Sequence, residues 1–183
     1  MSEVTFITGN QNKADYLAKM LGVPVRHQKI ELDEIQSTSL EEIVEHKVKQ
    51  AYRHIDRPAL VEDVSLGFDA MNGLPGPFIK FYVEQPNGLE NLCRSLDGFD
   101  DRDAVAACVF GYYDGEQLKL LRGELHGTVA DHPRGTNGFG WDAIFCPDGF
   151  GGLTRAEMNP SDDTTTYAAI KPFAALSEFL TSL

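Results

Sequence analysis

The pattern of apolar and polar positions predicts a strand, a helix and a second strand in the first thirty residues. Val4 to Thr8 is a short β-branched and apolar run that stops at Gly9-Asn10. Apolar residues then recur at helical spacing from Lys13 to Leu21, and Val23 to Ile30 is a second extended run. We therefore expect the order strand, loop, helix, strand.

A second helix and a third strand follow. Ser39, with Glu42 three residues later, matches a capping box that starts a helix through Ala51. Ala59 to Glu62 is a short apolar run typical of a buried strand. This alternation of strands and helices predicts a sheet with parallel strand pairs and right-handed crossovers.

Glycine and proline then interrupt the pattern. The segment from Val64 to Pro77 includes Gly73-Leu74-Pro75-Gly76-Pro77, and we expect an ordered loop there with no regular element. Gly88 to Leu96 has the spacing of a short helix. Helical spacing also predicts a C-terminal helix from Phe173 to Leu183, packed on the sheet.

Two long extended runs indicate an antiparallel hairpin between these helices. They span Ala104 to Tyr113 and Gln117 to Glu124, and Asp114-Gly115 joins them. Asp-Gly between alternating runs is a strong hairpin signal. The predicted sheet is therefore mixed.

The composition describes one globular domain over residues 1–183. Hydrophobic residues make up 42% of the chain and charged residues 24%, which is ordinary for a folded protein and unlike a disordered one. The formal net charge is -12, and a chain of this charge with no Lys/Arg cluster would be repelled by nucleic acid or an anionic membrane. We expect neither partner, although a triphosphate can still bind where a few cations, N–H groups and Mg²⁺ converge.

The cysteines and the first residues indicate a reducing compartment. Cys93, Cys108 and Cys146 are odd in number and widely spaced, so free buried thiols are expected in place of disulfides or a zinc site. Met1 to Thr8 lacks a basic segment and an apolar stretch long enough for export or membrane insertion. A cytoplasmic location is therefore predicted.

The turn after the first strand is a candidate phosphate site. Thr8 to Lys13 lies where a strand ends and a helix begins, so free N–H groups and the helix dipole favour an anion. Gly9 allows close backbone approach, and Lys13 adds a positive charge. The same spacing also fits an ordinary strand-to-helix turn, since the pattern of P-loop enzymes is absent.

Acidic residues follow two of the predicted strands. Glu62-Asp63 closes the third strand, so the two side chains point to opposite sides of the sheet edge where ligands of α/β proteins usually bind. Glu34, just after the second strand, could supply a further oxygen to Mg²⁺. Chance placement of acids in an acidic chain is the alternative.

Two glycine-flanked segments offer aromatic and charged side chains. Gly73 to Lys80 places a stiff turn before Phe78 and a cation, and Gly138 to Asp142 offers a large aromatic and a carboxylate that could accept from base N–H groups. A rigid surface turn and a buried structural Trp141 are the corresponding structural alternatives.

Together these segments resemble the inosine triphosphatase-like nucleotide pyrophosphatases. The matching pieces, in the family's order, are TGNQNK at Thr8 to Lys13, ELDEIQ at Glu31 to Gln36, VEDVSL at Val61 to Leu66, GLPGPFIK at Gly73 to Lys80, FGWDAIF at Phe139 to Phe145 and PDG at Pro147 to Gly149. Each piece is short, and their common order carries the resemblance. It implies an elongated, two-lobed α/β fold in which helices flank a central twisted mixed sheet, assembled as a homodimer.

The resemblance also implies an enzyme and a reaction. It implies a hydrolase acting on phosphoric anhydride bonds, which cleaves ITP, dITP and XTP to the monophosphate and pyrophosphate with Mg²⁺ and so cleanses the nucleotide pool. Glu34 and Asp63 would hold Mg²⁺, and Asp63 would also be the catalytic base. The residues implied to contact the substrate are Thr8, Gly9, Asn10, Gln11, Asn12, Lys13, Lys47 and Lys80 at the phosphates, and Phe139, Gly140, Trp141 and Asp142 at the nucleoside.

The chain departs from the family pattern before its last helix. The family commonly carries a Lys and then a Ser-His-Arg triplet that reads the 6-oxo purine, whereas Asn159 to Ala168 contains no such triplet. The family's hydroxyl residue after the catalytic Asp is Val64 here. The candidates that could replace the base-reading groups are Lys171 and Thr164, Thr165 or Thr166. A pyrophosphatase of relaxed base specificity, or a slow nucleotide-binding regulator, therefore remains an alternative, and we expect a weak preference for ITP over GTP.

Overall fold

The structure is a computed structural model that describes residues 4–21 and 26–183. Contacts between residues divide the chain into two compact units. Unit 1 consists of Met1–Asp63, Cys108–Arg122 and Pro172–Leu183, and unit 2 of Val64–Ala107 and Gly123–Lys171. The expectation of one domain over residues 1–183 stays a prediction.

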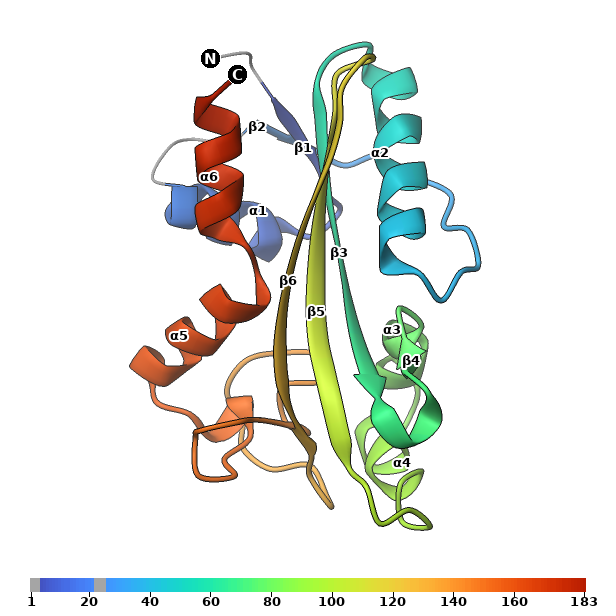
Figure 1. Ribbon diagram of the computed structural model, residues 1–183, viewed down its shortest axis with the longest axis vertical. Helices are drawn as coiled ribbons and strands as arrows, with labels where there is room; N and C mark the ends of the chain where they lie inside the picture. Colours follow the sequence, from blue (N-terminus) through green and yellow to red (C-terminus); the bar gives the residue numbers. More distant parts are fainter. Residues whose placement is uncertain (1–3, 22–25) are drawn as a thin grey trace. The chain divides into compact units, whose positions relative to one another are not determined.

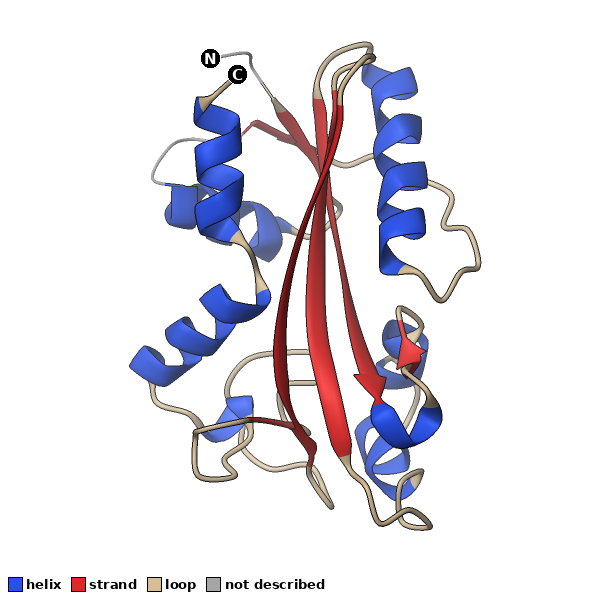
Figure 2. Ribbon diagram, in the orientation of Figure 1, coloured by secondary structure: helices blue, strands red, loops and turns tan. Residues whose placement is uncertain are grey.

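The strands form one mixed sheet (Figures 1 and 2). In the described part of the chain their order is β2-β1-β3-β5-β6-β7, with β4 paired to β3. Strand β1 is parallel to β2 and β3, whereas β4 is antiparallel to β3 and β7 to β6. The bounds are β1 Thr5–Ile7, β2 Arg26–Gln28, β3 Ala59–Phe68, β4 Leu74–Gly76, β5 Asp103–Tyr113, β6 Leu118–Val129 and β7 Phe145–Pro147. The α/β fold with a mixed sheet and flanking helices is confirmed.

The parallel part of the sheet lies in unit 1. Helix α1 (Gln11–Leu21) connects β1 to β2, and helix α2 (Leu40–Ile55) connects β2 to β3. Thr5 is opposite both Arg26 and Ala59, so β1 is the middle strand of the three. The predicted opening is confirmed, except that residues 22–25, with the start of the second predicted strand, lie outside the described residues.

Helix α2 begins at the predicted cap, although the cap differs from a full capping box. The Ser39 hydroxyl accepts from the Glu42 N–H at 3.3 Å. The Glu42 carboxylate accepts from the Ser37 hydroxyl at 2.7 Å, and the Ser37 oxygen accepts from the Ser39 N–H at 3.0 Å. Ser37 thus takes the place of the reciprocal half of the box, and the cap stabilises the helix by about 1 kcal/mol.

Strand β5 shows how helices cover both faces of the sheet in unit 1. Successive side chains of a strand point to opposite faces. The ring of Phe110 lies 5.8 Å from that of Phe173 in helix α6 (Phe173–Thr181), and the ring of Tyr112 lies 5.0 Å from that of Phe179. A Cβ on the intervening Gly111 would collide with Val44 of α2. The predicted packing of the C-terminal helix on the sheet is therefore confirmed.

The predicted loop after Glu62 is wrong in unit 2. Strand β3 continues to Phe68, and Leu74–Gly76 pairs with it as β4. The strand pair requires glycine at position 67, because a Cβ on Gly67 would lie only 2.7 Å from the carbonyl oxygen of Gly73. Glycine in this segment therefore permits two strands to approach closely, where composition alone indicated a loop.

Unit 2 contains one predicted helix and further short ones that were not predicted. Helix α4 (Gly88–Arg94) confirms the prediction. Helix α5 was missed, although Asn159 caps it by accepting from two N–H groups and Pro160 occupies its first position, which are both helix-start signals. The remaining elements are η1 (Asp69–Met71), α3 (Ile79–Val83), η2 (Arg155–Glu157) and α5 (Pro160–Ile170).

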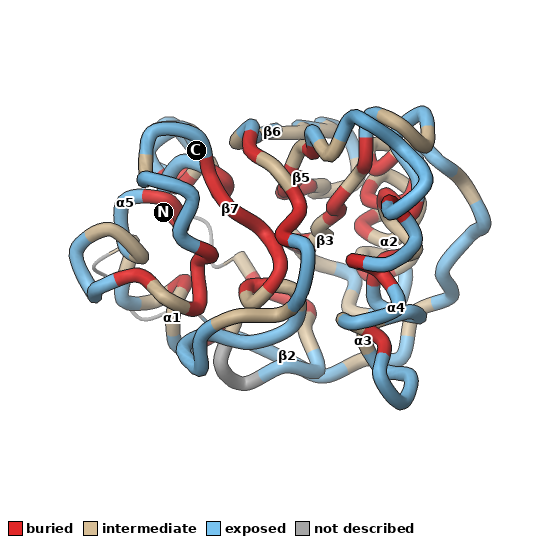
Figure 3. Tube along the Cα trace, turned by 90° about the horizontal axis from the view of Figure 1, so that it is seen from below, coloured by how far each residue is buried: buried red, intermediate tan, exposed pale blue. Residues whose placement is uncertain are grey.

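The hairpin and the thiols agree with the predictions. The Asp114 carboxylate accepts from the N–H groups of Glu116 and Gln117 at the tip between β5 and β6. All three cysteines are free and buried, and Figure 3 shows burial along β7 and much of β5. None of the helices in the described ranges is long and apolar enough to cross a membrane.

Candidate functional site

The turn from β1 into α1 is a capped helix start in unit 1. The Thr8 hydroxyl accepts from the Asn10 N–H at 3.1 Å. The Asn10 side chain accepts in turn from the Lys13 N–H at 3.3 Å, as an N-cap residue does. The first turn of a helix carries N–H groups without helical acceptors, and the dipole adds to their attraction for an anion. The side chains of Gln11 and Asn12 lie outside the described ones.

A second cation, which the sequence analysis did not identify, lies beside this turn. A Cβ built on Gly9 would be 3.6 Å from Cε of Lys29, so the Lys29 side chain runs alongside the Gly9 backbone. These are ordinary contact distances, and the protein itself therefore does not require glycine at this position. No spacing rule connects Lys29 with Gly9, because only the pairing of β1 with β2 brings the two segments together.

Glu62 and Asp63 lie within β3 and not at its end, because the strand continues to Phe68. The prediction that they close the strand is wrong. The parallel neighbour β1, however, ends just after the Phe6 to Leu60 pair. The two carboxylates are thus level with the carboxyl end of β1, the edge at which ligands of α/β sheets bind.

The two adjacent carboxylates point to different lysines, as alternation along a strand requires. Glu62 is buried, with a side chain 3% exposed, and its Oε1 lies 3.1 Å from Nζ of Lys13. Asp63 is 22% exposed and contacts Lys47. Glu62 is therefore the buried carboxylate of the pair and Asp63 the more accessible one.

Lys47 joins two carboxylates into one charged group. Its Nζ lies 2.8 Å from Oε1 of Glu34 and 3.0 Å from Oδ2 of Asp63. Burial lowers the pKa of Lys47, and the two carboxylates more than offset this, so the pKa is raised above its ordinary value. Lys47 therefore stays protonated at neutral pH.

The donor set of this group suits Mg²⁺. Mg²⁺ prefers carboxylate oxygens and commonly uses one or two, with water and substrate phosphates in its other positions. The oxygens of Glu34 and Asp63 converge on one ammonium group, which shows that both reach the same cation. Among the described residues there is no cluster of three or more His, Cys, Asp or Glu that would hold a metal ion without substrate.

In unit 2 the segment from Phe139 to Asp142 forms a tight turn. The Asp142 carboxylate accepts from the Phe139 N–H at 3.0 Å, and the Asp142 N–H donates to the Phe139 carbonyl at 3.2 Å. Gly138 and Gly140 have φ angles of +74° and +62°, which favour glycine. The turn leaves Phe139 58% exposed, while the Trp141 ring packs edge-on against Phe145 at 5.7 Å.

Asp142 is buried and bonded to a cation that the sequence analysis missed. Its Oδ1 accepts from Nη1 of Arg155 at 2.7 Å, and the two side chains are 7% and 3% exposed. Burial raises the pKa of the Asp142 carboxyl, and the guanidinium of Arg155 opposes this shift. Arg155 reaches α5 as well, with Nη2 2.7 Å from Oδ1 of Asp163 and Nε 3.1 Å from the Thr166 hydroxyl.

Comparisons with known proteins agree with this architecture. The model of the Ham1 family matches residues 4–179. The chain belongs to the Ham1 family. It is 42% identical to inosine triphosphate pyrophosphatase 2 of Trypanosoma cruzi, over 95% of this chain and 90% of that protein. It is 37% identical to the inosine triphosphate pyrophosphatase of Candida albicans, over the full length of both.

Solved structures of similar proteins have the same fold. The HAM1 protein of Coxiella burnetii superposes with a TM-score of 0.85 at 25% identity, over 100% of both chains. The nucleoside-triphosphatase, or dITP/XTP pyrophosphatase, of Mycobacterium abscessus superposes with a TM-score of 0.79 at 25% identity, over 94% of this chain and 97% of that one. The family resemblance drawn from the six sequence segments is confirmed.

The remaining predicted residues of this Ham1 family chain lie in unit 2. Lys80 is on α3 with its side chain 68% exposed, and its Nζ is 3.9 Å from a Glu84 oxygen. The hydroxyls of Thr164 and Thr165 donate to carbonyls of their own helix. Lys171 is buried, with Nζ 5.1 Å from the centre of the Tyr167 ring.

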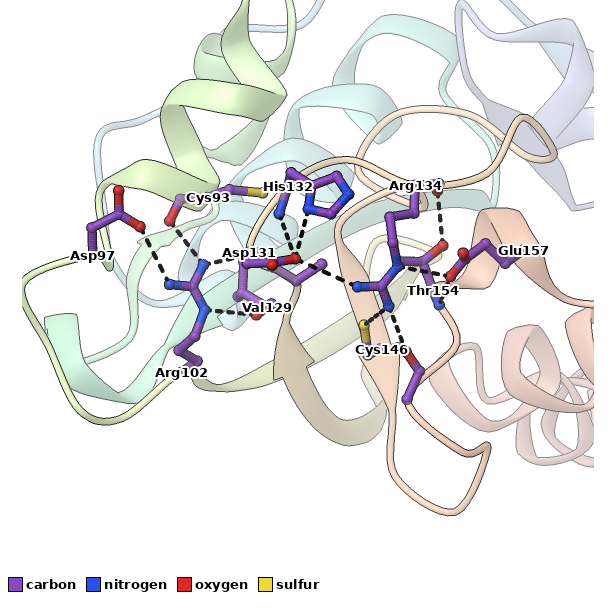
Figure 4. A network of polar contacts seen from close by, with 12 residues as sticks. Cys93, Asp97, Arg102, Val129, Asp131, His132, Arg134, Cys146, Thr154 and Glu157 are labelled. Atoms are coloured by element: carbon purple, nitrogen blue, oxygen red, sulfur yellow. Dashed lines mark hydrogen bonds and ion pairs between the residues drawn. The ribbon is translucent and has the colours of Figure 1, made fainter.

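A second polar network braces the segment that carries Arg155 (Figure 4). Arg134 Nε donates to the Glu157 carboxylate at 3.1 Å, and the Thr154 hydroxyl donates to the Arg134 carbonyl at 2.9 Å. Thr154 and Glu157 form a capping box around η2. The backbone on either side of Arg155 is therefore fixed independently of the ion pair that Arg155 makes.

Proposed function

We propose that this Ham1 family chain hydrolyses the non-standard purine nucleoside triphosphates ITP, dITP and XTP to the monophosphate and pyrophosphate, with Mg²⁺. The observation that carries the proposal is the convergence of Glu34, Asp63 and Lys47 at the edge of the parallel strands. The names of the curated relatives and of the Mycobacterium abscessus structure support the substrate class.

The phosphate end of the substrate would bind to unit 1. The capped first turn of α1 offers N–H groups and a dipole to an anion. Lys13, held by the buried Glu62, and Lys29 beside Gly9 add positive charge. Lys47 stays protonated because its pKa is raised, so it can neutralise charge that grows on the leaving pyrophosphate. Lys80, in unit 2, is proposed as a further phosphate contact on the strength of the resemblance.

Glu34 and Asp63 would hold Mg²⁺, which when bound supplies Lewis-acid polarisation of the phosphate oxygens. Asp63 would also accept the proton of the attacking water at a carboxylate oxygen, because its side chain is accessible where that of Glu62 is not. Lys47 orients both carboxylates through its two short contacts. These residues therefore act mainly by position and charge.

The base would be bound by the Phe139–Asp142 turn of unit 2. The exposed Phe139 ring provides a stacking surface, but every base has an aromatic face, so stacking discriminates little. The selection of hypoxanthine or xanthine must then come from polar groups near the turn, and Asp142 is the acceptor in that position.

Product analysis tests the proposal. ITP incubated with the protein and Mg²⁺, without inorganic pyrophosphatase, should yield IMP and pyrophosphate in equal amounts, and EDTA should stop the reaction until Mg²⁺ is restored. IDP and orthophosphate as the direct products would place the attack at the γ-phosphate and refute the proposal. No turnover of any triphosphate, with nucleotide binding retained, would support the regulator alternative.

The proposal extends to the assembly and the location of the protein. A homodimer and a cytoplasmic location are implied by the family resemblance. Light scattering of the purified protein would decide the first.

A further inference from the structure

Arg155 and Asp142 form a buried ion pair that the proposed chemistry at the phosphates does not use. The contact is 2.7 Å long and both side chains are nearly inaccessible. Taking two charges out of water costs free energy that their attraction only partly returns, and apolar residues of similar volume often stabilise a core equally well. Stability alone is therefore a weak reason for this pair.

The guanidinium connects two segments of unit 2. Its Nη2 and Nε are held by Asp163 and Thr166 of α5, and its Cζ lies 5.2 Å from the centre of the Tyr167 ring. Its Nη1 reaches Asp142, outside the helix. Since a guanidinium is planar and its donors are fixed in direction, anchoring on α5 determines where the Asp142 carboxylate lies.

Asp142 in turn determines the conformation of the turn before it. Arg155 contacts Oδ1 of Asp142, and the other carboxylate oxygen, Oδ2, accepts a hydrogen bond from the Phe139 N–H. The Asp142 N–H donates to the Phe139 carbonyl. Phe139 is the exposed ring of the turn. A change in the direction of the Asp142 carboxylate would therefore move this ring.

We propose that Arg155 is a positioning residue for base selection, which fixes the Asp142 carboxylate and, through it, the Phe139–Asp142 turn. This inference rests on the proposed function, in which the turn contacts the base. An ionised Asp142 is only an acceptor, so it matches a ring that presents an N–H, as 6-oxopurines do at N1. Adenine presents an acceptor there, and the mismatch disfavours ATP.

The charge state of Asp142 makes the role measurable. The ionisable groups that face it are Arg155 of η2, Asp163 of α5 and Lys171 at the end of α5. Burial and Asp163 raise the pKa of Asp142, whereas Arg155 and Lys171 lower it. Without Arg155 the carboxyl would hold its proton to higher pH, and a protonated carboxyl donates a hydrogen bond that suits adenine N1.

The test compares Arg155→Met and Arg155→Lys with Arg94→Met, which removes an exposed arginine of the same unit. kcat and KM for ITP and ATP are measured from about pH 6 to about pH 9, the range in which a raised carboxyl pKa would be seen. In Arg155→Met we expect the ITP to ATP ratio of kcat/KM to fall about tenfold or more at low pH, through KM, and to recover towards high pH. Arg155→Lys, which keeps the charge, should lose less, and Arg94→Met should match the wild type.

Equal losses for ITP and ATP at every pH would show that Arg155 only supports the fold, and would overturn the proposal. If Arg155→Met does not fold, Arg155→Lys and Thr166→Val decide, because the first keeps the positive charge without the planar donors and the second removes one anchor of the guanidinium. An unchanged KM and an unchanged ITP to ATP ratio in both would overturn it. Calorimetric binding of IMP and AMP to the same variants reports base selection without turnover, so this inference and the proposed hydrolysis can fail separately.

Discussion

Alanine at Gly138 should displace the Asp142 carboxylate, and alanine at Gly140 should not. A Cβ built on Gly138 lies 3.0 Å from Cγ of Asp142 and closer still to its Oδ2 oxygen. Real Cβ atoms do not approach other atoms so closely, so the carboxylate has to move. The same construction on Gly140 meets nothing within 4 Å. Both glycines have positive φ angles, so the second substitution is a matched control for backbone strain.

The expected losses of stability follow from these contacts. Alanine in the left-handed region costs about 1 to 2 kcal/mol, partly offset by about 0.4 to 1 kcal/mol from a less flexible unfolded chain. Gly140→Ala should therefore lower the free energy of unfolding by about 1 kcal/mol. Gly138→Ala should lose in addition the bond from the Phe139 N–H to the carboxylate, about 1.5 to 3 kcal/mol for a charged acceptor. We expect the two variants to differ by about 2 kcal/mol.

Urea unfolding of both variants measures this difference, provided that the slope against denaturant is unchanged. The KM for ITP should also rise more in Gly138→Ala than in Gly140→Ala. If Gly138→Ala and Gly140→Ala lower the free energy of unfolding by the same amount within about 0.5 kcal/mol, the reasoning is refuted. Differences of that size lie within the usual scatter between independent sites. Asp142 would then not be fixed by the turn that the structure shows.

Three further predictions concern other groups. Asp63→Asn should lower kcat for ITP about a hundredfold or more, as expected for loss of a general base. Asp56→Asn, the same change at an exposed left-handed position, should leave ITP turnover unchanged. Equal effects of the two substitutions would exclude Asp63 as the base. The pKa of Lys47 is raised above its ordinary 10.5, so its stabilising contribution is complete below that pH and is lost as pH rises through the folded pKa. Urea unfolding should therefore show a steeper loss of stability above about pH 10.5 in the wild type than in Lys47→Met, and parallel curves would contradict this. Burial raises the pKa of Cys93 to about 11. At about pH 8 this thiol should therefore react with a thiol reagent roughly a hundredfold more slowly in the folded protein than after unfolding. Equal rates in the folded and unfolded protein would show that the thiol is accessible.

The sequence predicted the fold where one segment determines its own structure. The parallel opening, the Asp114-Gly115 hairpin and the last helix follow from periodicity and turn chemistry, and all three are confirmed. The prediction failed at β3, where glycine and proline outweighed the alternation of Val64 to Phe68. Glycine weakens an isolated strand, but here Gly67 is the position at which the Gly73 carbonyl comes close. That contact depends on a strand pair that no local pattern contains.

In the candidate site, too, some residues could be identified from one segment, whereas others depend on contacts between segments. Thr8 to Lys13 could be identified because one turn supplies both the cap and the free N–H groups. Glu34 and Asp63 could be placed at one sheet edge from strand order alone, whereas Lys47 came only from the family resemblance. Its position in α2 carries no local signal, since the contact with Asp63 depends on how the helix packs against β3. Lys29 was missed for the same reason.

Arg155 shows why a missing motif does not mean a missing charge. The sequence analysis looked for the base-reading cation after Asn159, where the family carries it, and found only Lys171. The structure places a guanidinium on the preceding segment, and its carboxylate partners are Asp142 and Asp163, which precede and follow it in the chain. Arg155, Lys171 and Asp163 thus all influence the pKa of the Asp142 carboxyl in unit 2. Under the proposed role of Arg155, base selection therefore depends on the charge state of Asp142 and on the three charged side chains that influence it, and not on any single residue.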